Sequence, residues 1–440
     1  MFSRNTAPWF SSWAPGRGAS YRAHLRRVLP TSSARKVMVR TKSESPIIIN
    51  LMFPQIRIST HATPHARGVA LGQASRAQVG HSVATYARQF AACGIDWAQA
   101  SRLAQRYLPV IEALDAGLLD EMRGLAEGSQ VRFEDILTLN CRSEILPPNY
   151  FSGEPTAAEA ALKANRAAGI PDWADDVYAT PQLPSDLSEC TAMCVNGEAS
   201  ADGQTWFAQN WDWIGRQRAA LVIVESVDAN GTAFTTLTEG GMLAKIGMNQ
   251  HGFAIGLNIL RSLRDGAEPG VPVHILLRHL LSLTGMAAAR ERLSFIQRQL
   301  GFGAASNIPC ADAQGEVGCF EVAPAGWAEQ RPHEGVVVHT NHFLCESLLT
   351  QQAMMSNFLS SEPRLATAAQ HAAKKPLGLE SLQAFLRDES GEFLAVCRRP
   401  NPALPPEARV ESVAGIIMHP HTRRFWIAPD VPSKVDFQLV

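Results

Sequence analysis

The segment Ser188–Trp213 reads SECTAMCVNGEASADGQTWFAQNWDW and contains two apolar stretches separated by a polar one. Side chains alternate in character over Cys190–Val195, and an apolar stretch returns over Gln204–Trp211, as expected for β-strands. Asn196–Gly203, between them, is rich in the glycine, asparagine and aspartate that turns require. The segment therefore predicts a β-hairpin that begins with Cys190 and whose second strand runs into Asp212.

The rest of the C-terminal part alternates between strand and helix signals. Further strands are predicted at residues 220–226, 233–237, 245–248, 253–257, 304–310, 317–322, 336–339, 412–419 and 424–428. Helical periodicity occurs at residues 272–283, 287–299 and about 348–386. Antiparallel hairpins flanked by helices are typical of a layered sandwich, so we expect an α+β fold.

The chain divides into three parts by composition. Residues 1–50 are basic, and we expect either a disordered extension, an organelle-type presequence, or a start assigned too early. Residues 51–189 form an N-terminal part that is helical over about 65–145, after a short apolar run at 46–53 that predicts a strand. Its Pro-rich stretch 147–188 is interpreted as a loop. Residues 190–440 form the C-terminal, catalytic part.

The composition argues against several classes of partner. The 440 residues carry a net charge of −1, so the chain has no overall field that favours nucleic acid or an anionic membrane. No apolar run approaches the roughly 20 residues needed to cross a bilayer. The eight cysteines are scattered and lack CxxC spacing, which predicts reduced thiols and a cytoplasmic location. Import into an organelle by the basic N-terminus is the alternative.

Cys190 has two interpretations. A cysteine that opens a core strand is ordinarily an inert packing residue. Alternatively, the Glu189–Cys190 bond is cut, and the new α-amine, with a pKa of about 8, takes the thiol proton. One residue then supplies both nucleophile and base. Cys194 lies on the same face of the predicted strand and is a rival nucleophile, but it gains no α-amine.

Six ordered motifs resemble the cysteine-type N-terminal nucleophile (Ntn) hydrolases, and specifically the isopenicillin N acyltransferase-like family, also called acyl-CoA:6-aminopenicillanic acid acyltransferase-like. Choloylglycine hydrolases and acid ceramidases are more distant relatives. The motifs are TPHARG at 63–68, GLAEG at 124–128 with LNCRSEI at 139–145, Cys190-Thr191 with QNWDW at 209–213, GMNQHGFAIGLN at 247–258, HTNHF at 339–343, and the end strand around Arg423. They cover roughly residues 55–435. The resemblance implies a four-layer αββα sandwich with antiparallel sheets.

The resemblance also implies a role for each site residue. Cys190 is the nucleophile for self-cleavage and turnover, and Asp212 lies beside its α-amine and thiol. Asn341 supplies a side-chain N–H to the oxyanion, and the backbone N–H of Asn258 supplies the second donor. Arg423 is a fixed cation that favours the thiolate and braces Asp212.

Three positions depart from the family pattern or compete with it. Glu189 precedes the nucleophile, where the fungal acyltransferase has glycine, so we expect slower processing. Gln209 stands where bile salt hydrolases carry an arginine, which puts the chain on the acyltransferase side of the superfamily. Arg424 competes with Arg423, because strand alternation turns only one of the two inward.

Two other classes of function remain as alternatives. A metal hydrolase could use His339, His342, His419 and His421, but no HExxH motif or carboxylate-rich partner accompanies them, and we expect neither a metal nor a cofactor. An unprocessed relative that only binds a ligand is kept open by Glu189. We expect a self-processing zymogen that becomes an amidohydrolase or acyltransferase. Its two chains remain associated, and its substrate is a small acyl amide or an acyl-CoA-like thioester.

Overall fold

The structure is a computed structural model that describes residues 53–58, 62–147, 155–171, 190–353, 359–404 and 409–440. Leu51–Val440 forms one compact unit. The predicted basic extension 1–50 and the residue before the predicted cleavage point, Glu189, lie outside the described residues. The predicted first strand at 46–53 also lies almost entirely outside them, and the first described strand is β1 (Gln55–Arg57).

The N-terminal part is helical, as the sequence predicted. Its helices are α1 (Pro64–Ala74), α2 (Arg76–Ala92), α3 (Trp97–Ala104), α4 (Leu108–Ser129), α5 (Phe133–Asn140) and α6 (Arg142–Ile145). Helix α1 begins where the Thr63 hydroxyl accepts a hydrogen bond from the Ala66 amide at 3.2 Å. Helices α1 and α4 pack closely, and a Cβ added at Gly124 would lie 2.0 Å from the His65 carbonyl oxygen. Only glycine fits at that contact.

The Pro-rich stretch 147–188 is not wholly a loop. Residues Pro155–Ala167 form helix α7, and Leu162 is buried against Ala91 of α2. Proline is tolerated at the first position of a helix, because its missing N–H has no partner there anyway. The alanine-rich sequence that follows favours helix, so the loop prediction was wrong for these residues.

The first sheet, sheet A, runs in the order β1-β4-β5-β6-β7-β9-β10-β11, and β8 also pairs with β9. Its later strands are β4 (Leu221–Val227), β5 (Ala233–Glu239), β6 (Ile246–Asn249), β7 (Ala254–Ile255), β8 (Asn258–Ile259), β9 (Ser306–Ala311), β10 (Val317–Ala323) and β11 (Gly326–Gln330). The pairs are antiparallel except for β1 with β4, which is parallel. The sequence did not predict β8 or β11.

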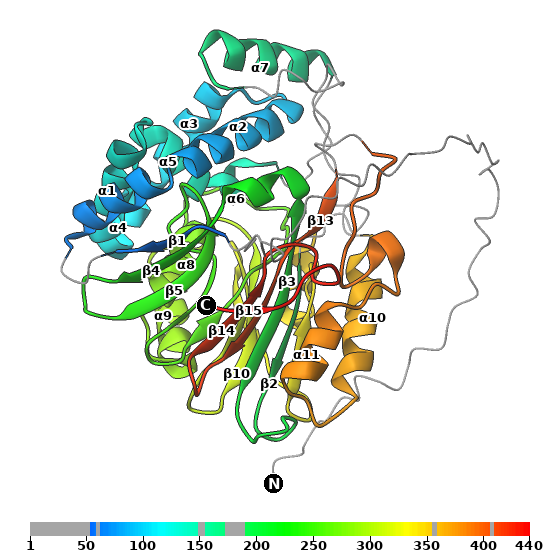
Figure 1. The fold of residues 1–440 in the computed structure, drawn as a ribbon. Helices are drawn as coiled ribbons and strands as arrows, with labels where there is room; N and C mark the ends of the chain where they lie inside the picture. Colours follow the sequence, from blue (N-terminus) through cyan, green and yellow to red (C-terminus); the bar gives the residue numbers. More distant parts are fainter. Residues whose placement is uncertain (1–52, 59–61, 148–154, 172–189, 354–358, 405–408) are drawn as a thin grey trace, which may run out of the picture. The chain divides into compact units, whose positions relative to one another are not determined.

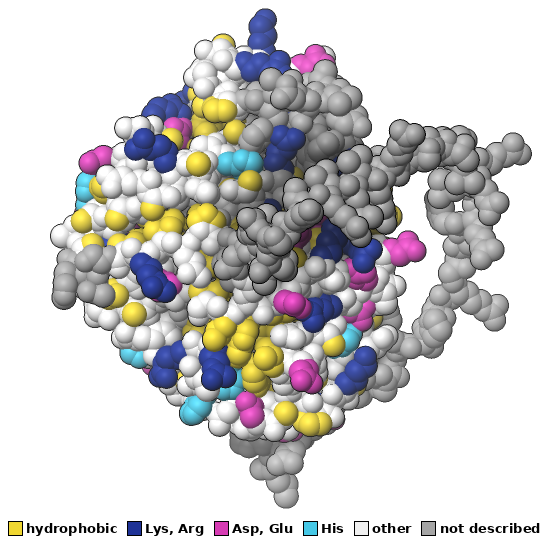
Figure 2. Space-filling model, viewed as in Figure 1, with side chains coloured by type: hydrophobic (Ala, Val, Ile, Leu, Met, Phe, Trp, Pro, Cys, Tyr) yellow, Lys and Arg dark blue, Asp and Glu magenta, His cyan; other side chains and the backbone are white. Residues whose placement is uncertain are grey.

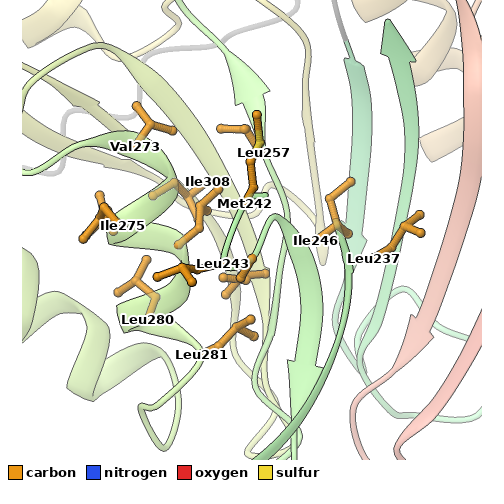
Figure 3. Close-up of a cluster of buried hydrophobic side chains, with 14 of the residues drawn as sticks. Leu237, Met242, Leu243, Ile246, Leu257, Val273, Ile275, Leu280, Leu281 and Ile308 are labelled. Carbon is orange, nitrogen blue, oxygen red and sulfur yellow. The ribbon is translucent and has the colours of Figure 1, made fainter. Parts of the chain in front are cut away.

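Helices α8 (Val273–Leu280) and α9 (Met286–Gln299) pack on sheet A. Figure 3 shows the buried side chains of this region, in which Ile275 and Leu280 of α8 lie beside Leu243 and Ile308. All the residues of α8 are buried, because the helix is covered on one side by the sheet and on another by α4 and α5.

The second sheet, sheet B, has the order β12-β2-β3-β13-β14-β15 and is antiparallel throughout. Its strands are β2 (Cys190–Val195), β3 (Trp206–Ile214), β12 (Val336–His339), β13 (Val410–His419), β14 (Arg424–Ala428) and β15 (Gln438–Leu439). The predicted hairpin is therefore confirmed as β2–β3, with Cys190 directly opposite Trp211.

Helices α10 (Ser361–Ala372) and α11 (Leu379–Leu386) cover the outer face of sheet B. On the inner face, β2 contacts β8, β9 and β10 of sheet A. The resulting order is helices, sheet A, sheet B, helices, with α10 and α11 beside β2 in Figure 1. This arrangement confirms the predicted α+β fold with four αββα layers.

The surface matches the balanced charge of the sequence. On the face drawn in Figure 2, basic and acidic side chains are interspersed. Within the described ranges, no helix combines the length and the apolar character needed to cross a bilayer.

Candidate active site

Cys190 is the first residue of β2, between β12 and β3 in sheet B. Its side chain shares a face with Trp211, because directly opposite residues of an antiparallel pair point to the same side. Both belong to the apolar cluster between the sheets, and Cys190 is 1% exposed. The thiol therefore projects into the interior of the sandwich.

Asn341 lies against the main chain of Cys190. The Cys190 backbone N–H donates to Asn341 Oδ1 at 3.1 Å, and Asn341 Nδ2 donates to the Ile259 carbonyl at 2.9 Å. The Asn341 backbone N–H donates to Ser361 Oγ at 2.8 Å, which fixes the segment after β12 against α10. The structure thus brings Asn341 to the predicted nucleophile, with its amide nitrogen turned to the strand that begins at Asn258.

Arg364 is the arginine of this site, and the sequence analysis missed it. From the first turns of α10, its Nη1 donates to the Cys190 carbonyl at 2.5 Å and to Thr191 Oγ1 at 2.7 Å. Its Nη2 donates to Asn341 Oδ1 at 2.7 Å, and the residue is fully buried. Arginine has only donors, so the Asn341 oxygen must face it and the Asn341 NH2 must face away.

Arg423 is not part of this cluster, so the assignment to Arg423 was wrong. It lies in the turn between β13 and β14, is exposed, and donates from Nε to the Gln250 carbonyl at 2.5 Å. The turn follows His419, whereas β13 passes Trp211 at Ala414, five residues earlier along the strand. The alternation argument failed because Arg423 is a turn residue with a φ of 58°, and Arg424 is exposed as well.

Asp212 lies one position beyond Trp211 in β3, just past the first residue of β2. It is fully buried, and its Oδ1 accepts a hydrogen bond from Ser412 Oγ at 2.6 Å. Because neighbours in a strand alternate, Trp211 and Trp213 point to the inner face while Asp212 points to the outer one. The carboxylate therefore lies near the main-chain start of β2. Burial and the charge of Asp212 contribute to raising the pKa of Cys397 to about 11.

Asn258 is held beside the site by its side chain. Its Nδ2 donates to the His339 carbonyl at 3.0 Å, and its Oδ1 accepts from Gln209 Nε2 at 2.8 Å. Gln209 also donates to the Leu257 carbonyl at 2.6 Å, so it holds the segment that leads into Asn258. A Cβ at Gly256 would lie 2.1 Å from Gln209 Oε1. The role of the Asn258 backbone N–H in an oxyanion hole stays a prediction.

Cys194 and the histidines considered for a metal site lie in environments of their own. Cys194 is fully buried inside β2, and burial raises its pKa well above the usual value. His339 contacts Glu321 at 2.8 Å, while His419, at the end of β13, contacts Asp202 at 3.0 Å. Over the described ranges, no three histidine, cysteine, aspartate or glutamate side chains are grouped so that they could hold a metal ion.

The layers and the cysteine that opens a central strand define a cysteine-type Ntn hydrolase fold. Residues 199–434, more than half of the chain, match the family model described as acyl-coenzyme A:6-aminopenicillanic acid acyl-transferase. The chain therefore belongs to this family. The matched region begins after Cys190 and includes Asp212, Asn258, Asn341 and Arg364.

A curated relative is the 40 kDa form of acyl-coenzyme A:6-aminopenicillanic-acid-acyltransferase from Emericella nidulans, which is 26% identical over 228 residues. The match covers 51% of this chain, and the chain spans about half the length (51%) of that relative. Among solved structures, penicillin V acylase from Agrobacterium tumefaciens is 15% identical with a TM-score of 0.38 and covers 55% of this chain and 83% of its own. A variant of conjugated bile acid hydrolase from Clostridium perfringens is 11% identical with a TM-score of 0.40 and covers 57% and 96%.

Proposed function

We propose that the chain is a precursor that cleaves itself between Glu189 and Cys190 and then acts as an acyltransferase or amidohydrolase. The observation that carries this proposal is the main-chain environment of Cys190, with its N–H on Asn341 Oδ1 and its carbonyl on Arg364. Both contacts come from side chains, one after β12 and one in α10, that meet at the first residue of the strand. The family membership supports an acyl-transfer chemistry.

In the proposed mature enzyme, the amine of Cys190 replaces its amide N–H. The amine donates to Asn341 Oδ1 along the contact that the amide makes here at 3.1 Å, and its lone pair takes the thiol proton. The buried carboxylate of Asp212, near the start of β2, stabilises the ammonium that results. Arg364 keeps Asn341 oriented with its oxygen to the amine and its nitrogen to the substrate.

The reaction then follows from these positions. The sulfur attacks the carbonyl carbon of an amide or thioester. The oxyanion that forms accepts hydrogen bonds from the Asn341 side chain and from the Asn258 backbone N–H. The ammonium of Cys190 returns a proton to the leaving amine or thiol, and an acyl-Cys190 thioester remains. Water or an amine attacks that thioester, gives a proton to the Cys190 amine and restores the thiol.

The two chains would stay together after cleavage, because buried polar contacts join the residues on either side of position 189. Tyr86 of α2 donates to Glu239 of β5 at 2.5 Å and accepts from Trp213 at 3.1 Å. Glu121 of α4 pairs with Arg278 of α8 at 3.5 Å. Losing such contacts would leave buried charges unpaired, which is strongly destabilising.

The proposal is tested with two matched cysteine variants. Cys190→Ala removes the nucleophile, and Cys194→Ala removes an equally buried thiol from the same face of β2. We expect Cys190→Ala to remain one uncut chain without amidase or acyltransferase activity, while Cys194→Ala is cut and active. Two chains in the Cys190→Ala protein would contradict the proposal.

A further inference from the structure

Trp211 has a buried indole N–H that no described group accepts. Its Nε1 atom is inaccessible to solvent and has no hydrogen-bond partner, although the residue is fully buried. Its neighbours differ, since Trp213 Nε1 donates to Tyr86 at 3.1 Å and Trp206 Nε1 donates to Asp202 at 3.1 Å. Buried indole N–H groups ordinarily find an acceptor. Trp211 therefore has an unused donor, and it lies directly opposite Cys190.

A buried cation lies over the same ring. The ammonium of Lys245 is 3.8 Å from the centre of the Trp211 ring and 2.9 Å from Glu239 Oε1. Lys245 is 1% exposed and reaches from sheet A to a side chain of sheet B. The counter-charge of Glu239 is already shared, because its other oxygen accepts from Tyr86 at 2.5 Å and from Gln217 at 2.8 Å.

His274 of α8 adds a second side chain with unused hydrogen-bonding groups. Neither ring nitrogen has a hydrogen-bond partner among the residues that the structure describes, and the residue is fully buried. Burial lowers its pKa well below the usual value, and the charges of Arg142 and Lys245 lower it further. The imidazole is therefore neutral, with one N–H to donate. The two neighbouring cations oppose a proton on His274 in addition to its burial.

We propose that Trp211 and Lys245 form a subsite that binds a carboxylate of the substrate next to Cys190. This inference rests on the proposed function, because it concerns the molecule that Cys190 attacks. One carboxylate oxygen accepts the Trp211 indole N–H, and the carboxylate lies beside the Lys245 ammonium. Trp211 and Lys245 then determine specificity for acids over neutral amides, while Asn341 and Asp212 perform the chemistry on either.

The subsite is tested with two alkylating reagents that differ in one group. Iodoacetate carries a carboxylate and iodoacetamide a neutral amide, and either forms an S–C bond to the thiolate sulfur with loss of iodide. The ratio of their rates at Cys190, located by peptide mass analysis, is divided by the same ratio for free cysteine. We expect this normalised ratio to be about tenfold above one, the effect of one hydrogen bond to a charged group.

Trp211→Phe keeps the aromatic ring and removes the N–H, so we expect the ratio to fall most of the way to one. Trp206→Phe is the control, since it removes an indole N–H from the opposite face of the same strand. A second variant, the double change Glu239→Gln with Lys245→Gln, removes both charges of this ion pair, and it should lower the ratio too. A wild-type ratio of one, or a raised ratio that Trp211→Phe keeps, overturns the subsite.

The intact mass of the same samples tests the proposed self-cleavage independently of the alkylation ratio. An intact mass that corresponds to one uncut chain contradicts self-processing whatever the alkylation ratio. A cut protein whose Cys190 reacts with neither reagent overturns the subsite while self-processing stands.

Three substrates then show whether the bound carboxylate belongs to the acyl side or to the amine side of the substrate. Hexanoyl-alanine carries it on the amine side, adipoyl-alaninamide carries it on the acyl side, and hexanoyl-alaninamide has none. We expect one of the two acids to exceed the neutral compound about tenfold in kcat/KM, and Trp211→Phe to reduce that preference. Equal kcat/KM for all three compounds overturns the subsite.

Discussion

The substitution Arg364→Lys tests whether Arg364, which no sequence motif indicated, holds Cys190 and Asn341 in position for catalysis. The change keeps the positive charge but replaces a planar fork of donors by a single nitrogen. Arg364 donates to the Cys190 carbonyl, to Thr191 Oγ1 and to Asn341 Oδ1, at 2.5, 2.7 and 2.7 Å. A lysine nitrogen in the position of Nη1 can serve the Cys190 carbonyl and Thr191 Oγ1, but it cannot also replace the Nη2 donor to Asn341 Oδ1.

The magnitude follows from the hydrogen bond to Asn341 Oδ1 that is lost. A hydrogen bond to a charged group contributes about 1.5–3 kcal/mol. If this loss raises the activation free energy by the lower limit of that range, the rate drops about tenfold. The loss should appear in kcat rather than in KM, because Arg364 holds Cys190 and Asn341 and does not touch the substrate in this account.

The assay compares Arg364→Lys with Arg423→Ala, which removes the arginine that the sequence had suggested. Both purified proteins are first shown to be cut and to unfold at temperatures close to the wild type. Steady-state rates with one acyl amide then give kcat and KM. We expect a loss of about tenfold or more in kcat for Arg364→Lys and no loss for Arg423→Ala. A wild-type kcat in Arg364→Lys, or an equal loss in Arg423→Ala, would show that Arg364 does not position Cys190 and Asn341 for catalysis.

Three further predictions concern the carboxylates and the helix contact. Asp212→Asn should impair processing and turnover while circular dichroism shows an unchanged fold, and full activity would remove Asp212 from the site. Gly124→Ala places a Cβ 2.0 Å from the His65 carbonyl and should destabilise the protein by about 3 kcal/mol or more, whereas Gly80→Ala, with nothing within 4 Å, should not destabilise it in thermal unfolding. Burial raises the pKa of Glu144 to about 7, so between pH 4.5 and 7 the folded chain binds more protons than the unfolded chain, and this group lowers stability as pH rises. Glu144→Gln keeps an oxygen for the Val273 amide, which now donates to Glu144 at 2.8 Å, and its melting temperature relative to wild type should increase from pH 5 to pH 8; parallel pH curves would contradict the shift.

Local patterns sufficed for much of the fold. The hairpin of Cys190 and Trp211 was predictable because alternation and turn residues are encoded within a few positions of each other. The strand Val336–His339 was also predicted with its observed bounds. Helix α7 was missed because the proline content of its surroundings was given more weight than the alanine-rich run inside it.

The site was predictable only where a motif named the residue. Asn341 and Asp212 came from the family resemblance, and the structure places both beside the start of β2. Arg364 is 173 residues from Thr191 and lies in a helix whose sequence does not distinguish it from a surface arginine. Its function depends on how α10 packs on sheet B, which no local pattern specifies. The indole N–H of Trp211 can likewise be recognised as lacking an acceptor only when the positions of the surrounding atoms are known.

The intact mass of the purified protein under denaturing conditions, with N-terminal sequencing of each chain, measures self-cleavage before Cys190 directly. We expect two chains whose masses sum to that of the precursor plus one water, the second beginning Cys-Thr-Ala-Met. A single uncut chain that survives long incubation, or a second chain that begins at another residue, would contradict it.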